Sequence, residues 1–269
     1  MPELPEVEFI KRRLSRWTVG RSIQTVEVPD PKALQSDSGT LAGRSFQTWE
    51  RKGKYLVGLM DDGRGLLSHL GMTGKWVADP KPDRPHQRLR LHFGDDEGPL
   101  TVALIDPRRL GLNWLLDATA LSPHPRLVRL GPDAMSDTLT PEELSLRVGS
   151  DHRPLKRRLM DQAVVAGLGN IMVSEMCWRA RVHPHCPCAQ VDEASWLRLH
   201  QAVRDHVLEV LEKEQGEEIL YVSGGGGASD FLCYGRAGEP CGRCGTTLAS
   251  DKLDGRTSTW CPACQPLET

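Results

Sequence analysis

The sequence predicts an α+β protein with an antiparallel β domain in its N-terminal half, a helical domain after it and a metal-bound hairpin near its C-terminus. Three observations favour this class. Short apolar runs broken by turn residues fill residues 22 to 116. Apolar residues at helical spacing dominate the stretch from 140 to 214, and four paired cysteines follow. At 269 residues the chain is long enough for two ordinary domains.

Composition places the chain among globular proteins without revealing its partner. It has 39% hydrophobic residues, no apolar N-terminal signal and no uncharged apolar stretch long enough for a membrane span, so we expect a cytoplasmic protein. The net charge of −2 does not by itself indicate a nucleic-acid partner. Basic clusters would form a phosphate track if they converged on one groove; they lie at Lys11 to Arg13, Arg51 to Lys54, Arg108 to Arg109 and Lys156 to Arg158.

The first predicted element is a helix from Glu6 to Val19. Pro5 suits a first helical turn, and Gly20 supplies a stop. The apolar positions with helical spacing are Val7, Ile10, Leu14 and Trp17. The runs that follow, from "SIQTVEV" to "NWLLD", predict the antiparallel β domain.

The second half reads as helices. In "TPEELSLRV" Thr140 is placed as N-cap, Pro141 at the first helical position and Glu143 as the closing residue of a capping box. Two helices are expected to flank "VAGLGN", and a longer one to run from Asp192 to about Glu214. We expect the domain boundary between residues 117 and 138. The glycine-rich "SGGGGAS" at 223 to 229 predicts a linker or a loop that moves over a ligand.

Four cysteines near the C-terminus predict a zinc site. Cys241, Cys244, Cys261 and Cys264 have the spacing C-x2-C-x16-C-x2-C, which is typical of two thiolate knuckles around one tetrahedral zinc. Four thiolates leave no open position, so the metal is expected to be structural. Lys252, Arg256 and hydroxyl residues between the knuckles suit phosphate contact.

A second cysteine-rich stretch leaves two interpretations open. "HPHCPC", with His183, His185, Cys186 and Cys188, is either a second metal site or a proline-stiffened loop with ordinary thiols. Cys177 and Cys233 are expected to be buried as small hydrophobic residues.

Seven motifs in chain order resemble the formamidopyrimidine-DNA glycosylases, whose superfamily includes endonuclease VIII. They are "MPELPEVE", "RKGKYL", "SHLGMTG", "IDPRRLG", "LMDQAVVAGLGNI", "CYGR" with "GEPC", and "CGRC" with "GRTSTWCPAC". The resemblance covers nearly the whole chain and implies a two-lobed fold with DNA between the lobes. The implied domains are an N-terminal antiparallel β-sandwich with flanking helices (1–125), a helix-two-turn-helix domain (126–222), and a mobile loop with a four-cysteine zinc finger (223–269).

The resemblance also implies a chemistry. Met1 is removed, the secondary amine of Pro2 attacks the anomeric carbon of a damaged nucleotide, and a Schiff base remains after the base departs. An α-amine has a pKa of about 8, so much of it is free base near neutral pH. Glu3 matches the acid/base carboxylate, and Lys54 matches the lysine that holds a phosphate. The implied function is base excision repair of 8-oxoguanine and formamidopyrimidines by a bifunctional glycosylase and abasic-site lyase, with β,δ-elimination.

DNA contacts are implied in the same way. The family's phosphate-contact positions are occupied by His69, Lys156, Asn170 and Arg256. Met72, Arg109 and Leu110 match the residues that fill the gap left by the extruded nucleotide. The implied partner is double-stranded DNA with damaged bases or abasic sites, bound by a monomer that carries one structural Zn²⁺ and no organic cofactor. In a bacterium it would be associated with the nucleoid.

Two departures leave the substrate open. Leu110 stands where phenylalanine is typical, and Met172 where tyrosine is usual. Oxidised pyrimidines or unusual lesions are therefore alternative substrates. A retained Met1 would make the nucleophile an unreactive amide nitrogen, which favours a second reading as a non-enzymatic binder of damaged DNA. A zinc-ribbon interaction module would explain the cysteines but not Pro2, Glu3 and Lys54.

Overall fold

The computed structural model describes residues 2–36, 39–94, 98–213, 216, 218 and 231–267. The chain divides into two compact units, Met1–Val128 with Leu211–Tyr221 and Arg129–Val210 with Val222–Thr269. Met1 and the segment "SGGGGAS", predicted as a linker or moving loop, lie outside the described residues. In the described part of the chain, none of the helices combines the length and the apolar character of a membrane span.

The first unit is a β-sandwich. Its four-stranded sheet has the order β1 (Ile23–Glu27), β7 (Gln87–Phe93), β8 (Leu100–Ile105) and β6 (Lys75–Ala78). Its five-stranded sheet has the order β2 (Gln35–Ser36), β9 (Leu112–Leu116), β5 (Gly65–His69), β4 (Tyr55–Met60) and β3 (Phe46–Lys52). The pairs are antiparallel as predicted, except that β2 is parallel to β9. The 3₁₀ turn Pro31–Ala33 lies just before β2. Asn113 in β9 donates to Ala33 O at 2.6 Å and so holds this turn beside β9.

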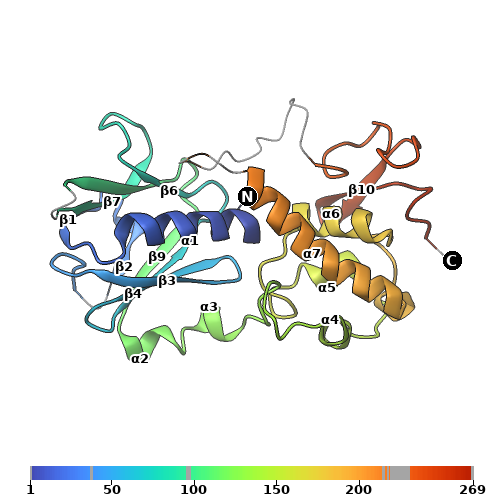
Figure 1. Ribbon diagram of the computed structural model, residues 1–269, viewed down its shortest axis with the longest axis horizontal. Coiled ribbons are helices and arrows are strands. Elements are labelled where there is room, and N and C mark those ends of the chain that lie inside the picture. Colours follow the sequence, from blue (N-terminus) through green and yellow to red (C-terminus); the bar gives the residue numbers. More distant parts are fainter. Residues whose placement is uncertain are drawn as a thin grey trace. The chain divides into compact units, whose positions relative to one another are not determined.

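Helix α1 (Leu4–Thr18) contacts β6 and β3, the edge strands of the two sheets, and so covers one side of the sandwich (Figure 1). The predicted apolar face is confirmed, because it lies in a core shared with both sheets; its members are Val7, Ile10, Leu14 and Trp17. The helix begins two residues earlier than predicted, since Glu3 and Glu6 form a capping box at its start. The helix ends just before Gly20, which has a positive φ of 80°.

Short helices α2 (Ala118–Leu121) and α3 (Pro125–Val128) complete the Met1–Val128 part of the first unit, and the second unit is mainly helical. Its helices are α4 (Pro141–Val148), α5 (Leu155–Leu159), α6 (Asn170–Ala180) and α7 (Glu193–Lys213), with a 3₁₀ turn at Cys188–Gln190. As predicted, the hydroxyl of Thr140 accepts from Glu143 N at 3.2 Å. The predicted role of the Glu143 side chain was wrong: its carboxylate pairs instead with Arg147, one turn further on, at 2.5 Å.

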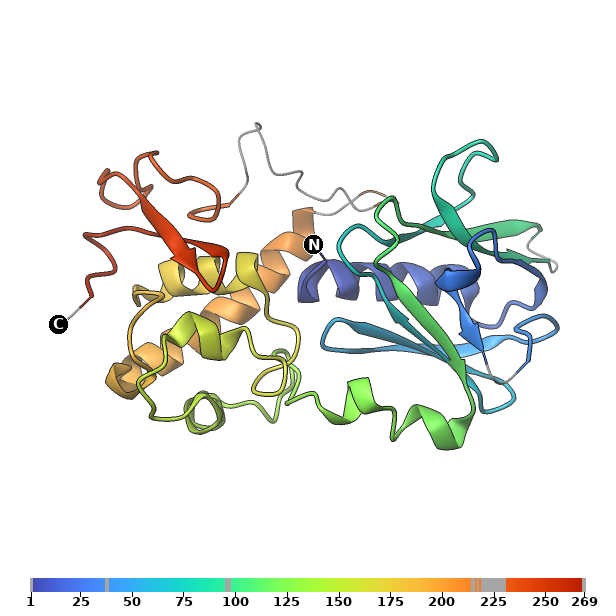
Figure 2. The same ribbon diagram turned by 180° about the vertical axis from the view of Figure 1, so that it is seen from behind.

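The C-terminal hairpin joins β10 (Ala249–Leu253) to β11 (Arg256–Trp260) and lies against α6 (Figure 2). Asp254 and Gly255 form its two-residue turn with φ of 50° and 76°. A type I′ turn requires positive φ at both central positions, which Asp-Gly accommodates. The turn places Arg256 at the first position of β11, where its side chain is exposed.

Candidate functional site

The N-terminus of α1 places Pro2 beside a buried acid. Pro2 is buried, and Glu3 is only 1% exposed. In the capping box, the Glu6 carboxylate accepts a hydrogen bond from Glu3 N–H at 2.8 Å. This bond fixes the backbone directly after Pro2 and thereby orients the Glu3 carboxylate.

Glu6 is the second acid of this cluster. Withdrawal of its carboxyl from water and, to a smaller extent, the charge of Glu3 raise the pKa of Glu6 from 4.5 to about 7. Near neutral pH Glu6 is therefore present in both its protonated and its ionised form. A carboxyl group whose pKa lies near the working pH is suited to proton transfer.

The raised pKa of Glu6 predicts a stability change with pH. Between about pH 4.5 and 7 the folded protein retains a proton that the unfolded chain has lost, so stability falls as pH rises through this window. We expect the free energy of unfolding of the native protein to fall between pH 5 and pH 8. This decrease should exceed the decrease in Glu6→Gln by up to about 3 kcal/mol. The glutamine carbonyl can still accept the Glu3 N–H bond. Urea unfolding at both pH values measures this, and an equal decrease in the two proteins contradicts it.

Lys54 lies in the turn between β3 and β4. Lys52 pairs with Tyr55 across that turn, and Gly53 has a φ of 60°. Arg51 donates to Gly53 O at 3.1 Å and to the Glu8 carboxylate of α1, also at 3.1 Å. The Lys54 turn is thus tied to the helix that carries Pro2 and Glu3. Arg51 and Glu8 were not predicted as site residues, because each looks like an ordinary surface charge in the sequence.

His69, at the end of β5, is a neutral hydrogen-bond donor. Its ring stacks on Tyr55 at a centroid distance of 4.7 Å, and its Nδ1 accepts from Gly71 N–H at 3.2 Å. Burial, with the nearby charges of Lys54 and Arg126, lowers the pKa of His69 to about 4. An imidazole that accepts at Nδ1 carries its proton on Nε2, so that nitrogen can donate to an anion.

Met72 and Leu110 lie on two loops that touch through their backbones. Gly71 has a φ of +62°, and a Cβ added there would lie 2.4 Å from the carbonyl carbon of Leu110. Only glycine permits this approach. Leu110 is 45% exposed, although large apolar side chains are usually buried. The two predicted wedges therefore belong to one paired structure.

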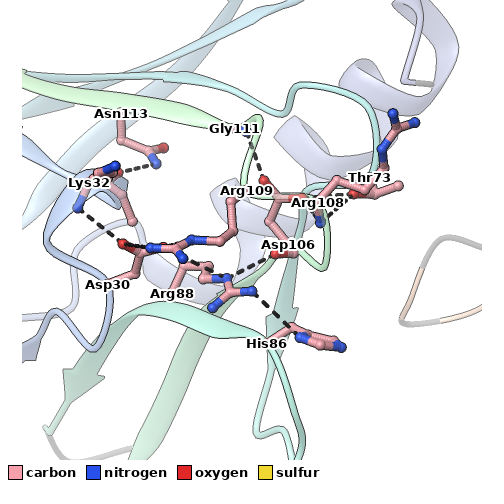
Figure 3. A network of polar contacts seen from close by, with 11 residues as sticks. Asp30, Lys32, Thr73, His86, Arg88, Asp106, Arg108, Arg109, Gly111 and Asn113 are labelled. Carbon is pink, nitrogen blue, oxygen red and sulfur yellow. Dashed lines mark hydrogen bonds and ion pairs between the residues drawn. The ribbon is translucent and has the colours of Figure 1, made fainter.

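The arginine predicted between them has a different environment. Arg109 forms a two-pronged ion pair with the buried Asp30, with Nε to Oδ2 at 2.7 Å and Nη2 to Oδ1 at 2.8 Å (Figure 3). In this state Asp30 holds the Arg109 guanidinium, and the predicted reach of Arg109 to an orphaned base stays a prediction. Arg108 is exposed, and within the described residues its side chain has no hydrogen-bond or ion-pair partner.

In the second unit, Asn170 begins α6 after a tight turn. Gly167 has a φ of 106° and donates to Gln162 Oε1 at 3.0 Å, while Gln162 Nε2 donates to Leu168 O at 2.7 Å. Gln162 therefore fixes the turn that presents Asn170, a role that the sequence did not reveal. Among the described residues, Asn170 Oδ1 is buried without a hydrogen-bond partner. The first residues of a helix are favourable neighbours for a phosphate.

Lys156 is not on the surface. The residue is 1% exposed, and its Nζ donates to Thr257 O at 2.8 Å and to Ser174 Oγ at 3.3 Å. In this state the ammonium forms its hydrogen bonds within the protein, as a buried charge requires, so the predicted direct phosphate contact of Lys156 stays a prediction. Lys156 connects α5 and α6 to the residue that follows Arg256.

The four predicted zinc ligands converge. Their Sγ atoms all lie within 4.8 Å of one another, and Cys244 Sγ is 3.5 Å from the Sγ atoms of Cys261 and Cys264. Sulfurs about 2.3 Å from a tetrahedral zinc are separated by about 3.8 Å. None of the eight cysteines, all of which lie in the described residues, forms a disulfide. The site fits one structural zinc, and Cys241 and Cys261 share a small core with Trp178 of α6.

Cys177, Cys188 and Cys233 are buried outside the zinc cluster. Within the described residues, the zinc cluster is the single group of three or more histidine, cysteine or acidic side chains placed to hold a metal, which favours the loop interpretation of "HPHCPC". There Cys188 donates to Arg153 O at 3.1 Å, and His183 packs on Trp260. Cys177 and Cys233 are fully buried as predicted, and burial raises the pKa of both thiols.

Three domain families match the chain in order. The formamidopyrimidine-DNA glycosylase N-terminal domain matches residues 1–112, the formamidopyrimidine-DNA glycosylase H2TH domain residues 130–220, and the zinc finger found in FPG and IleRS residues 238–267. The fold and the zinc site define a DNA glycosylase of base excision repair. The chain belongs to the formamidopyrimidine-DNA glycosylase family, as its motifs predicted.

Individual relatives agree over the full length. The formamidopyrimidine-DNA glycosylases of Symbiobacterium thermophilum and Acidothermus cellulolyticus are 37% and 36% identical; each alignment covers 99% of this chain, with 90% and 98% of the relatives. The MutM (Fpg) structure from Thermus thermophilus has a TM-score of 0.84 at 32% identity and covers 100% of both chains. The complex of Lactococcus lactis Fpg with abasic-site DNA has a TM-score of 0.85 at 29% identity, covering 98% of this chain and 99% of that one.

Proposed function

We propose that this glycosylase excises 8-oxoguanine and formamidopyrimidines from double-stranded DNA and then cleaves the abasic site as a lyase. The observation that carries the proposal is the start of α1, where Pro2 and the 1% exposed Glu3 are adjacent and fixed by a capping box. The abasic-site DNA bound by the Lactococcus lactis relative supports the same substrate class.

In the proposed reaction Pro2 acts after removal of Met1. Its secondary amine forms a bond to C1′ while the glycosidic C–N bond breaks, and the base leaves with a proton. Opening of the sugar ring gives an iminium ion that draws electrons from the adjacent C–H bond. Loss of the C2′ proton then expels the 3′ phosphate, and a second elimination expels the 5′ phosphate. Glu3 protonates the ring oxygen and moves protons during elimination.

Phosphate contacts are proposed from both units. Lys54 and the Nε2–H of His69 serve in the first unit, and Asn170 and the exposed Arg256 in the second. Each is a donor suited to an anionic oxygen. Lys156 acts indirectly by holding the backbone beside Arg256.

The extruded nucleotide leaves a gap that Met72 and Leu110 are proposed to fill. We assign the accompanying guanidinium to Arg108 rather than Arg109, because Arg109 is held by Asp30. Leucine in place of an aromatic wedge is smaller and stacks less well on a base. The protein is proposed to act as a monomer on the cytoplasmic nucleoid DNA of its bacterial host.

Excision from defined duplexes tests the substrate. Protein that begins at Pro2 by N-terminal sequencing is incubated with duplexes carrying 8-oxoguanine, an oxidised pyrimidine or an abasic site. Cleavage at 8-oxoguanine and at the abasic site is expected. Faster cleavage at the oxidised pyrimidine would show that oxidised pyrimidines, not oxidised purines, are the preferred substrates. Tight binding without cleavage of any duplex supports the non-enzymatic alternative.

A further inference from the structure

The two loops that carry Met72 and Leu110 are joined by one buried carboxylate. Asp106 follows β8 and is 1% exposed. Its Oδ1 accepts from Thr73 Oγ1 at 2.7 Å, on the Met72 loop, and from Arg108 N at 3.2 Å, on the Leu110 loop. Its Oδ2 accepts from Gly111 N at 2.7 Å (Figure 3). One side chain therefore spans both ends of the Leu110 loop and reaches the other loop.

The surroundings give this carboxylate little freedom. Arg88 Nε donates to Asp106 O at 2.9 Å, and Asp106 N donates to His86 O at 3.0 Å, so the backbone is held from strand β7 and the turn before it. A buried charge is tolerated where hydrogen bonds satisfy it, and charge-assisted bonds are the stronger ones. The bonds to Asp106 are therefore well suited to fix the positions of the loops.

A second contact couples the same loops. Gly71 approaches the backbone of Leu110 so closely that no side chain fits between them. Two residues further along the Met72 loop, Thr73 donates its hydrogen bond to Asp106 and forms a second connection between the loops. Movement of either loop alone would break the Gly71–Leu110 contact or the Thr73–Asp106 hydrogen bond.

We propose that Asp106 is a positioning residue, which holds the Met72 and Leu110 loops together so that they enter the DNA as one unit, with Thr73 as the link. The proposal rests on the gap-filling role assigned to these loops. Inserting two linked wedges costs less conformational entropy than ordering two independent loops upon binding. Asp106 itself touches neither substrate nor reacting atoms in this account.

The link can be removed with little change of shape. Thr73→Val deletes the hydroxyl, and Thr73→Ser retains it as the matched control. Two rates are measured for each protein, 8-oxoguanine excision from a duplex and cleavage at an abasic site in a single-stranded oligonucleotide. A single strand has no opposite base and no gap for the wedges to fill. Its cleavage rate therefore measures the chemical steps without a contribution from Met72 and Leu110.

We expect Thr73→Val to lower the duplex rate about tenfold, as for a hydrogen bond to a charged group. The single-strand rate is expected to stay within about twofold, and Thr73→Ser to resemble the native protein. Asp106→Asn is expected to lower the duplex rate further, because its amide must point a donor at Thr73 and Arg108 or at Gly111.

Other outcomes separate the two proposals. A native duplex rate in Thr73→Val overturns the inference, as does an equal loss on both substrates, which indicates general disruption. If the native protein acts on neither substrate, the proposed function fails and this inference fails with it.

Discussion

Replacing Glu3 by glutamine is expected to lower the rate of 8-oxoguanine excision by a factor of about 10² to 10⁴, the usual contribution of a general acid or base. Glutamine has nearly the same size and retains an oxygen that can accept hydrogen bonds. The start of α1 should therefore persist. Single-turnover excision from a duplex measures the loss.

The matched control is Glu50→Gln, which neutralises an exposed carboxylate in the same unit. Its excision rate should equal that of the native protein. The affinity of Glu3→Gln for an abasic-site duplex should stay within about threefold of native, since one buried neutralisation leaves the phosphate donors in place. An excision rate for Glu3→Gln within tenfold of native would remove Glu3 from the chemistry.

Replacing Cys261 by alanine is expected to abolish zinc binding and weaken DNA binding by at least tenfold. Cys261 is a buried predicted ligand directly after β11, and a structural zinc supplies folding energy to the segment that it closes. Loss of the hairpin also displaces Arg256. Its proposed charge-assisted contact with a phosphate would contribute a factor of about ten or more to DNA affinity. Zinc released to a chromogenic chelator and DNA titrations measure the two effects.

Cys177→Ala is the control, because it removes a thiol that is equally buried but outside the zinc cluster. It should retain one zinc per chain and native DNA affinity. A Cys261→Ala protein that binds DNA like the native protein contradicts a role of the hairpin in DNA binding.

Local patterns in the sequence were sufficient for much of the fold. The spacing of Val7, Ile10 and Leu14 predicted the buried face of α1, because helical periodicity is a local property. The turn at Asp254 and Gly255 and the cap at Thr140 likewise depend on a few adjacent residues. The zinc site was predictable because cysteine spacing alone encodes two knuckles.

Other parts depend on partners far away in the chain. Lys156 looked like one member of a surface cluster, but its ammonium meets a carbonyl 101 residues away. Arg109 finds Asp30 79 residues before it, so the sequence could not tell which arginine of the pair stays available. The parallel pairing of β2 with β9 has the same cause, because two short segments meet only in the folded unit.

The measurement that tests the central claim most directly is borohydride trapping on an abasic-site duplex, comparing the native protein, beginning at Pro2, with Pro2→Gly. Borohydride reduces an iminium to a stable amine, so the native protein should form a covalent complex with DNA. A primary glycine amine reacts less effectively, and the trapped fraction in Pro2→Gly should fall at least tenfold. Peptide mapping should place the adduct on residue 2. No adduct with the native protein, or an adduct on an internal lysine, contradicts Pro2 as the nucleophile.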